Sequence, residues 1–125
     1  MTTTTNSIDD DSGQSLGLDV HQFGAGAIIR VRGELDAYGA PRLEEIGSDL
    51  IADGVGDLVI ELGETSFLDS SGLRAILTLH QRVGNDGGEF AIGNPSESVM
   101  RLLEITGLVD HFTIRRDDAA EAVVE

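Results

Sequence analysis

The sequence predicts an α/β protein with a mostly parallel, mixed β-sheet that is covered by helices. Stretches with the spacing of strands and stretches with the spacing of helices alternate along most of the chain, which is typical of a parallel sheet with helical connections. Near the amino end, two strand-like stretches follow each other directly, which predicts an N-terminal hairpin. The length of 125 residues is enough for a single domain with a sizeable core.

The hairpin is the first expected element. Leu16–Phe23 alternates apolar and polar residues, as a half-buried strand does. The glycines of Gly24-Ala25-Gly26 favour a turn, and Ala27–Arg32 is a second strand that pairs with the first. Gly33 is expected to end this second strand. Because Gly24-Ala25-Gly26 joins two strands and opens no helix, it is interpreted as a turn and not as part of a dinucleotide-binding loop.

Residues 1–14 are expected to form a disordered tail. A run of threonines and the acidic Asp9–Asp11 dominate this segment, which offers almost nothing to bury in a core. The folded domain is therefore expected to span residues 15–125.

The first helix is expected to begin at Ala40-Pro41, because proline suits the first turn of a helix. Its apolar residues recur at helical spacing, and Gly54 lies beyond its end. These apolar residues are Leu43, Ile46, Leu50 and Ile51. The apolar run Asp57–Leu62 then predicts the third strand.

A second helix is expected to open within Asp69-Ser70-Ser71-Gly72, after a short loop. Helical spacing of its apolar residues supports this start, and they are Leu73, Ile76, Leu77 and Val83. A turn at 85–88 and a strand at 89–93 follow. The next helix is expected to begin at Asn94-Pro95-Ser96-Glu97, which resembles a capping box, and to end at Gly107. The last expected elements are a strand at 112–114 and a terminal helix at 117–124.

The charge balance excludes several kinds of partner. Acidic residues number 23 and basic residues 8, so the formal net charge is −15. Such a surface repels nucleic acid and anionic membranes, and it favours proteins with basic patches. All basic residues are arginines, which excludes a Walker A lysine, a Schiff base and a lysine general base.

The composition also indicates where the protein works. It contains no cysteine, which excludes disulfides and thiolate zinc sites and favours a reducing compartment. No apolar run approaches the length of a membrane span, and the first residues lack the pattern of a signal peptide. A cytoplasmic location is therefore expected.

The sequence does not predict an enzyme. Ser70 is flanked by Asp69 and Ser71, so the Gly-x-Ser-x-Gly pattern of many serine hydrolases is missing. The histidines are His21, His80 and His111, and none stands at metal-ligand spacing from another. We expect no catalytic residue, no metal site and no cofactor.

Asp69-Ser70-Ser71-Gly72 is the most informative segment of the chain. A strand's end and a helix's start bring an aspartate and two serine hydroxyls to one exposed point. The first N–H groups of a helix favour negative charge, so a phosphate on one of these serines would lie where the backbone can receive it. The alternative is an ordinary helix start with an aspartate as N-cap.

A second acidic cluster is Gly33-Glu34-Leu35-Asp36. If the strands before Asp36 and before Ser70 run parallel, both residues lie at the carboxyl edge of the sheet, where open α/β folds place their sites. The alternative is a pair of solvated acids in a loop.

Together, Gly33–Asp36 and Phe67–Leu73 resemble the STAS-domain family of bacterial anti-sigma factor antagonists. The resemblance spans roughly Leu16 to Ala120 and implies a STAS-like single domain. It implies an antagonist that binds an anti-sigma factor serine kinase and so releases a sigma factor. It further implies that the kinase phosphorylates Ser70 and blocks binding, and that a metal-dependent, PPM-type serine phosphatase restores it.

The resemblance also implies a partner-binding face, made of Asp36, Asp69, Ser70, Ser71 and Gly72. One alternative is a STAS subunit or interaction module of a lipid ABC transporter or of a stress-signalling complex, in which the serine motif is an interface loop. An enzyme of another type is the third hypothesis, which the absence of lysine and of a serine–histidine pair disfavours.

Overall fold

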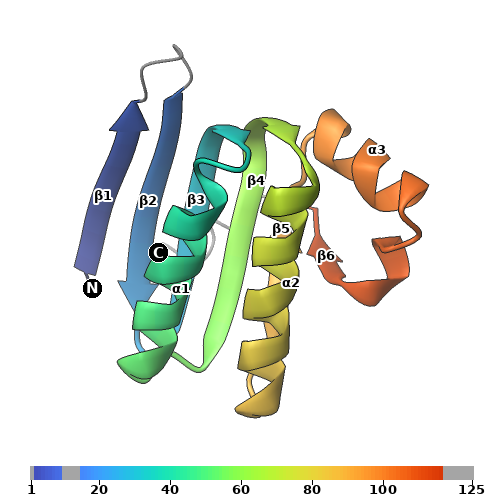
Figure 1. Ribbon diagram of the computed structural model, residues 1–125. Helices are drawn as coiled ribbons and strands as arrows, with labels where there is room; N and C mark the ends of the chain where they lie inside the picture. The colour runs from blue at the N-terminus through green and yellow to red at the C-terminus, as the bar shows by residue number, and fades with distance from the viewer. Residues whose placement is uncertain (1, 10–14, 117–125) are drawn as a thin grey trace.

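The protein is a six-stranded mixed sheet with two helices packed side by side on one face, as the computed structural model in Figure 1 shows. The structure describes residues 2–9 and 15–116, with side chains from Leu16 on. The elements are β1 (Thr2–Asp9), β2 (Ser15–Phe23), β3 (Gly26–Leu35), α1 (Ala40–Ala52), β4 (Asp57–Leu68), α2 (Ser70–Asn85), β5 (Phe90–Gly93), α3 (Glu97–Ile105), a short 3-10 helix (Val109–His111) and β6 (Thr113–Arg115).

Strand order follows chain order from β1 to β6. Pairing is antiparallel from β1 to β3 and parallel from β3 to β6. The predicted fold class, a mostly parallel sheet with an N-terminal hairpin and covering helices, is confirmed.

The core lies between the sheet and the apolar faces of α1 and α2. Alternate residues of the strands point toward these helices, as the strand period of two requires. The fully buried side chains of this layer include Leu18, Ile29, Val31, Leu43, Leu58, Ile60, Leu62, Ile76, Leu79 and Ile92. α3 packs beside β4 at one edge of this layer (Figure 1).

The amino-terminal segment differs from the expected disordered tail. Thr2–Asp9 forms β1, which pairs antiparallel with β2 so that Thr2 lies opposite Gln22. The expectation rested on how little the segment can bury, whereas strand pairing uses backbone groups and threonine is a β-branched residue that suits strands. The other expected tail residues, 1 and 10–14, lie outside the described residues.

Gly33 does not end its strand, contrary to our prediction. β3 continues to Leu35, and Gly33 adopts a φ of 99°, in the region that favours glycine. The pairing of β3 with β4 shifts register between Arg30 and Arg32 and again between Gly33 and Glu34, so the glycine stands at an irregularity of the ladder, as in a bulge. β4 also runs past the predicted Leu62, to Leu68. The two strands therefore reach the same edge together.

The third covering helix begins later than predicted. Its N-cap is Ser96, whose Oγ accepts the N–H of Val99 at 3.3 Å. Asn94, the expected first cap, has a φ of 42° and lies in the turn before the helix. Of the remaining expected elements, the last strand is confirmed as β6, and the terminal helix at 117–124 lies outside the described residues. The short 3-10 helix was not predicted.

Candidate partner-binding site

The carboxyl ends of β3 and β4 bring the two predicted motifs together. Leu35, the last residue of β3, lies opposite Leu68, the last residue of β4. The backbone N–H of Asp69 points to the carbonyl of Leu35 with an N···O distance of 3.4 Å. Asp36 and Ser70 therefore lie at one edge of the sheet, as predicted, where α1 and α2 begin.

Asp69 caps the second helix. Its Oδ1 accepts the backbone N–H groups of Ser71 at 2.9 Å and of Gly72 at 3.0 Å, while its carbonyl accepts the N–H of Leu73 at 2.9 Å. The carboxylate thus occupies the positive end of α2. This arrangement corrects part of our expectation, because two of the N–H groups offered to a phosphate are already hydrogen-bonded.

Ser70 is the exposed serine of the motif. It is the first residue of α2, and its hydroxyl has no hydrogen-bond partner within the described part of the chain. Ser71 is half-buried. A partner that approaches the sheet edge therefore reaches the Ser70 hydroxyl more readily than that of Ser71.

Gly72 is buried, and its role is to let α2 approach the sheet. A Cβ at this position would lie 2.5 Å from Cδ1 of Leu68 and 2.6 Å from the carbonyl oxygen of Leu35. Real Cβ contacts are not this short, so only glycine fits without movement. Gly72 was predicted to be a partner-binding residue, but it is buried. It positions the start of α2 against the sheet and offers no exposed surface itself.

Asp36 shapes the turn into the first helix. Its Oδ1 accepts the N–H groups of Tyr38 at 3.0 Å and of Gly39 at 3.2 Å, and its carbonyl accepts the N–H of Ala40 at 2.8 Å. The carboxylate is half-buried. Asp36 and Asp69 therefore each organise the backbone at the start of a helix, and they leave part of their negative charge at the same edge.

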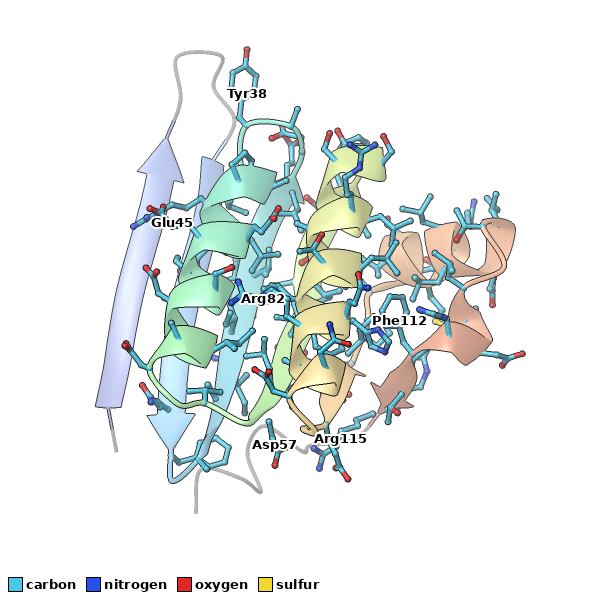
Figure 2. All side chains as sticks on the ribbon, turned by 60° about the horizontal axis from the view of Figure 1, so that its bottom comes forward. Tyr38, Glu45, Asp57, Arg82, Phe112 and Arg115 are labelled. Atoms are coloured by element: carbon cyan, nitrogen blue, oxygen red, sulfur yellow. The ribbon has the colours of Figure 1, made fainter. Side chains whose placement is uncertain are left out.

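Two exposed aromatic side chains lie at this edge, and sequence reasoning missed them. Among the described residues, the large hydrophobic side chains that remain exposed are Tyr38 at 74%, Phe67 at 47% and Ile105 at 75%. Tyr38 follows Asp36 and projects away from the protein beyond α1 (Figure 2), while Phe67 precedes Leu68 at the end of β4. Each of these aromatic residues stands two positions from a motif aspartate, Asp36 or Asp69, and this closeness was the available signal.

The histidines form no site with Ser70. His80 lies ten residues further along α2, roughly 15 Å along a helix axis, so it cannot act as a base for the serine. Its ring packs against those of His111, Phe90 and Phe112, with a centroid distance of 4.9 Å to His111. Burial, and then the charge of His111, lower the pKa of His80. Residues 2–9 and 15–116 contain no cluster of three potential metal ligands.

A hollow of about 930 Å³ lies away from the serine motif. Its lining includes Phe23, Asp57 and Glu89, at the end of the sheet opposite to Ser70, and none of the predicted site residues contributes to it. Asp57 and Tyr38 mark the two ends in Figure 2. The serine motif therefore lies outside this hollow, at the other end of the sheet.

Comparison with known proteins connects this chain to a family. The model of the STAS domain matches residues 18–120. The anti-sigma-B factor antagonist of Staphylococcus aureus (strain NCTC 8325 / PS 47) is 37% identical over 82 residues, which is 66% of this chain and 76% of the relative. The protein of the same name from Bacillus subtilis (strain 168) is 36% identical over 96 residues, covering 77% of this chain and 87% of the relative.

Solved structures share the fold. A crystal structure of an anti-sigma factor antagonist from Mycobacterium paratuberculosis has a TM-score of 0.75 at 28% identity and covers 94% of this chain and 100% of its own. The unphosphorylated form of the anti-sigma factor antagonist SpoIIAA has a TM-score of 0.73 at 23% identity and covers 86% of this chain and 95% of its own. None of the helices among the described residues is long and apolar enough to cross a membrane. With the family model matching most of its length, the chain belongs to the STAS domain family.

Proposed function

We propose that this protein is an anti-sigma factor antagonist whose binding to its partner is controlled by phosphorylation of Ser70. The partner is an anti-sigma factor that is also a serine kinase, and binding it releases a sigma factor. The observation that carries the proposal is the exposed, unbonded Ser70 hydroxyl at the edge shared by Asp36 and Tyr38. The names of the relatives from Staphylococcus aureus and Bacillus subtilis support it.

The geometry supports binding rather than catalysis by this chain. The edge offers a reachable hydroxyl, two acidic groups and the aromatic rings of Tyr38 and Phe67. Exposed aromatic residues are typical anchors of protein interfaces, and acidic groups favour a partner with a basic patch. The partner kinase supplies the chemistry, and the antagonist supplies the hydroxyl that it modifies.

A phosphate would change this surface strongly. It adds about −1.5 to −2 charges at neutral pH beside the Asp69 carboxylate and near Asp36. An interface that buries a neutral hydroxyl would then meet a dianion that is expensive to desolvate. A PPM-type phosphatase would return the protein to its binding form. We place this cycle in the cytoplasm, without direct contact to nucleic acid.

The alternative is a STAS subunit or module of a lipid transporter or stress-signalling complex. The curated relatives named above carry the antagonist name, which favours the antagonist. An assembly subunit would keep one partner whether or not Ser70 is modified, so loss of binding after phosphorylation distinguishes the two functions.

The proposal is tested by incubating the protein with the kinase encoded near it and ATP, and mapping the phosphate by mass spectrometry. We expect one phosphate, on Ser70. Ser70→Ala should abolish labelling and keep kinase binding, while the matched control Ser71→Ala should be labelled as the wild type is. Phosphate on Ser71 in the unaltered protein would falsify the assignment.

Replacing Asp36 separates its two roles. Asp36→Asn keeps an oxygen that can accept the N–H groups of Tyr38 and Gly39, so the free energy of unfolding should change by less than ~0.5 kcal/mol. Loss of the charge should weaken anti-sigma factor binding roughly tenfold, or about 1.4 kcal/mol. Thermal denaturation and titration calorimetry measure the two effects.

Asp86→Asn is the matched control for Asp36→Asn. It removes the same charge from the exposed far end of α2. If both variants bind the anti-sigma factor equally well, the position of Asp36 does not matter for binding. Asp36 would then be a solvated acidic residue of the loop, without a role of its own in the interface.

A further inference from the structure

The start of α2 has little left to offer a phosphate on Ser70. Helix N-termini bind anions through free N–H groups, but Asp69 already accepts those of Ser71 and Gly72. The Asp69 carboxylate also brings a negative charge to the position that the phosphate would use. A phosphate on Ser70 therefore needs a positive charge from elsewhere.

Arg74 is placed to provide that charge. It lies four residues after Ser70 on α2, and residues at this spacing are neighbours on one helix face, about 5–6 Å apart at Cβ. An acidic group four residues before a basic one is the favourable order on a helix. The phosphate would carry about −1.5 to −2 charges, and a guanidinium binds such oxygens with two parallel hydrogen bonds.

In the unmodified protein Arg74 is exposed and has no partner within residues 16–116. The ion pairs found there join Arg32 to Asp19 at 3.0 Å and Arg42 to Glu45 at 2.7 Å. Arg74 therefore gives up no existing interaction when a phosphate appears beside it.

Three acidic residues at this edge oppose the phosphate, and Arg42, in the first turn of α1, already pairs with Glu45 at 2.7 Å. The three are Asp69, the N-cap of α2, Asp36 in the turn before α1, and the half-buried Glu34 near the end of β3. The other arginine of α2 is Arg82, eight residues beyond Arg74 and roughly 12 Å further along a helix axis. Arg74 is therefore close enough to pair with a phosphate on Ser70, whereas Arg82 is too far along the helix.

We propose that Arg74 is the positioning residue that pairs with the phosphate of phosphorylated Ser70 and holds it against the surface of α2. This inference rests on the proposed function in one respect, that Ser70 is the phosphoacceptor. It assigns to Arg74 a role that begins only after phosphorylation, because the side chain has no partner in the described residues before then.

The test uses full-length protein in which phosphoserine is incorporated at position 70 during translation, so that no kinase is needed. Titration followed by ³¹P NMR gives the second pKa of the phosphate. Arg74→Gln should raise this pKa by about 0.3–0.6 pH unit, the size expected for one positive charge lost at 5–8 Å through water. Arg74→Lys should restore most of the shift, and Arg82→Gln should leave the pKa as it is in the unsubstituted protein.

Two outcomes would overturn the inference. One is an equal phosphate pKa with and without Arg74, in variants whose circular dichroism is unchanged. The other is an Arg82→Gln effect as large as that of Arg74→Gln, which would mean that only net charge matters. The proposed function fails separately, if the protein with phosphoserine at position 70 binds the anti-sigma factor as tightly as the unmodified protein does.

Discussion

Protein that carries phosphoserine at position 70 is expected to bind the anti-sigma factor two to three decades more weakly than unmodified protein does. The exposed Ser70 hydroxyl follows the Asp69 cap and lies at the same sheet edge as the Asp36 turn, so the phosphate adds its charge where two carboxylates already lie. A loss of ~3–4 kcal/mol from repulsion and desolvation is enough for this change in affinity. Titration calorimetry with both forms measures it.

The same phosphate should leave the fold unchanged. Ser70 is exposed, so a group added to its hydroxyl extends into solvent rather than into the core. Backbone chemical shifts should therefore change only near Asp36 and Ser70. Ser70→Asp should weaken binding less than the phosphate does, because one carboxylate has less charge and fewer acceptor oxygens. Shift changes that reach α3 would show a conformational switch and contradict the local electrostatic explanation.

The substitution Gly72→Ala is expected to destabilise the protein by about 1–3 kcal/mol, as overpacking does. The new Cβ would meet the carbonyl oxygen of Leu35 at 2.6 Å, and a backbone atom in a paired strand cannot rotate away. In an open helix the same change would stabilise, since alanine is a better helix former than glycine by about 1 kcal/mol. A loss of stability in Gly72→Ala would therefore indicate close contact between α2 and β3, and a gain would indicate that this contact is absent.

Gly84→Ala is the control on the same helix. Nothing lies within 4 Å of a Cβ at Gly84, so this variant should be as stable as the unsubstituted protein or more stable by up to about 1 kcal/mol. Chemical denaturation of both variants gives the comparison. Equal stability of the two would show that α2 does not approach β3 as closely as the contact at Gly72 requires.

The order of strands and helices could be predicted because the signals are local. The alternation in β2, the proline at the start of α1 and the serine motif at the start of α2 each lie within a few residues. Placing Asp36 and Ser70 at one edge required one further step, that the strands before them run parallel, and the pairing of Leu35 with Leu68 confirms it.

What the sequence did not reveal depends on contacts between distant segments. The bulge at Gly33 exists only where β3 pairs with β4, and β1 only where the chain pairs with β2. The exposure of Phe67 depends on what covers the strand's end, which periodicity does not report. Asp69 is a helix cap, as the alternative interpretation of the motif had it. Because it occupies the N–H groups at the start of α2, the positive charge that pairs with a phosphate has to come from another residue.

The strand order of the sheet, identical to the order along the chain, has a consequence for how the surface forms. Each strand pairs with the strand before it, so every new pairing closes a loop of limited length and the entropic cost of each closure stays modest. Both halves of the Ser70 surface come from one continuous stretch, from β3 to the first turns of α2. As the chain leaves the ribosome, the edge that carries Asp36 and Ser70 is complete in sequence before β5, α3 and β6 have been synthesised. Those later elements extend the sheet, and they contribute nothing to the Ser70 motif itself.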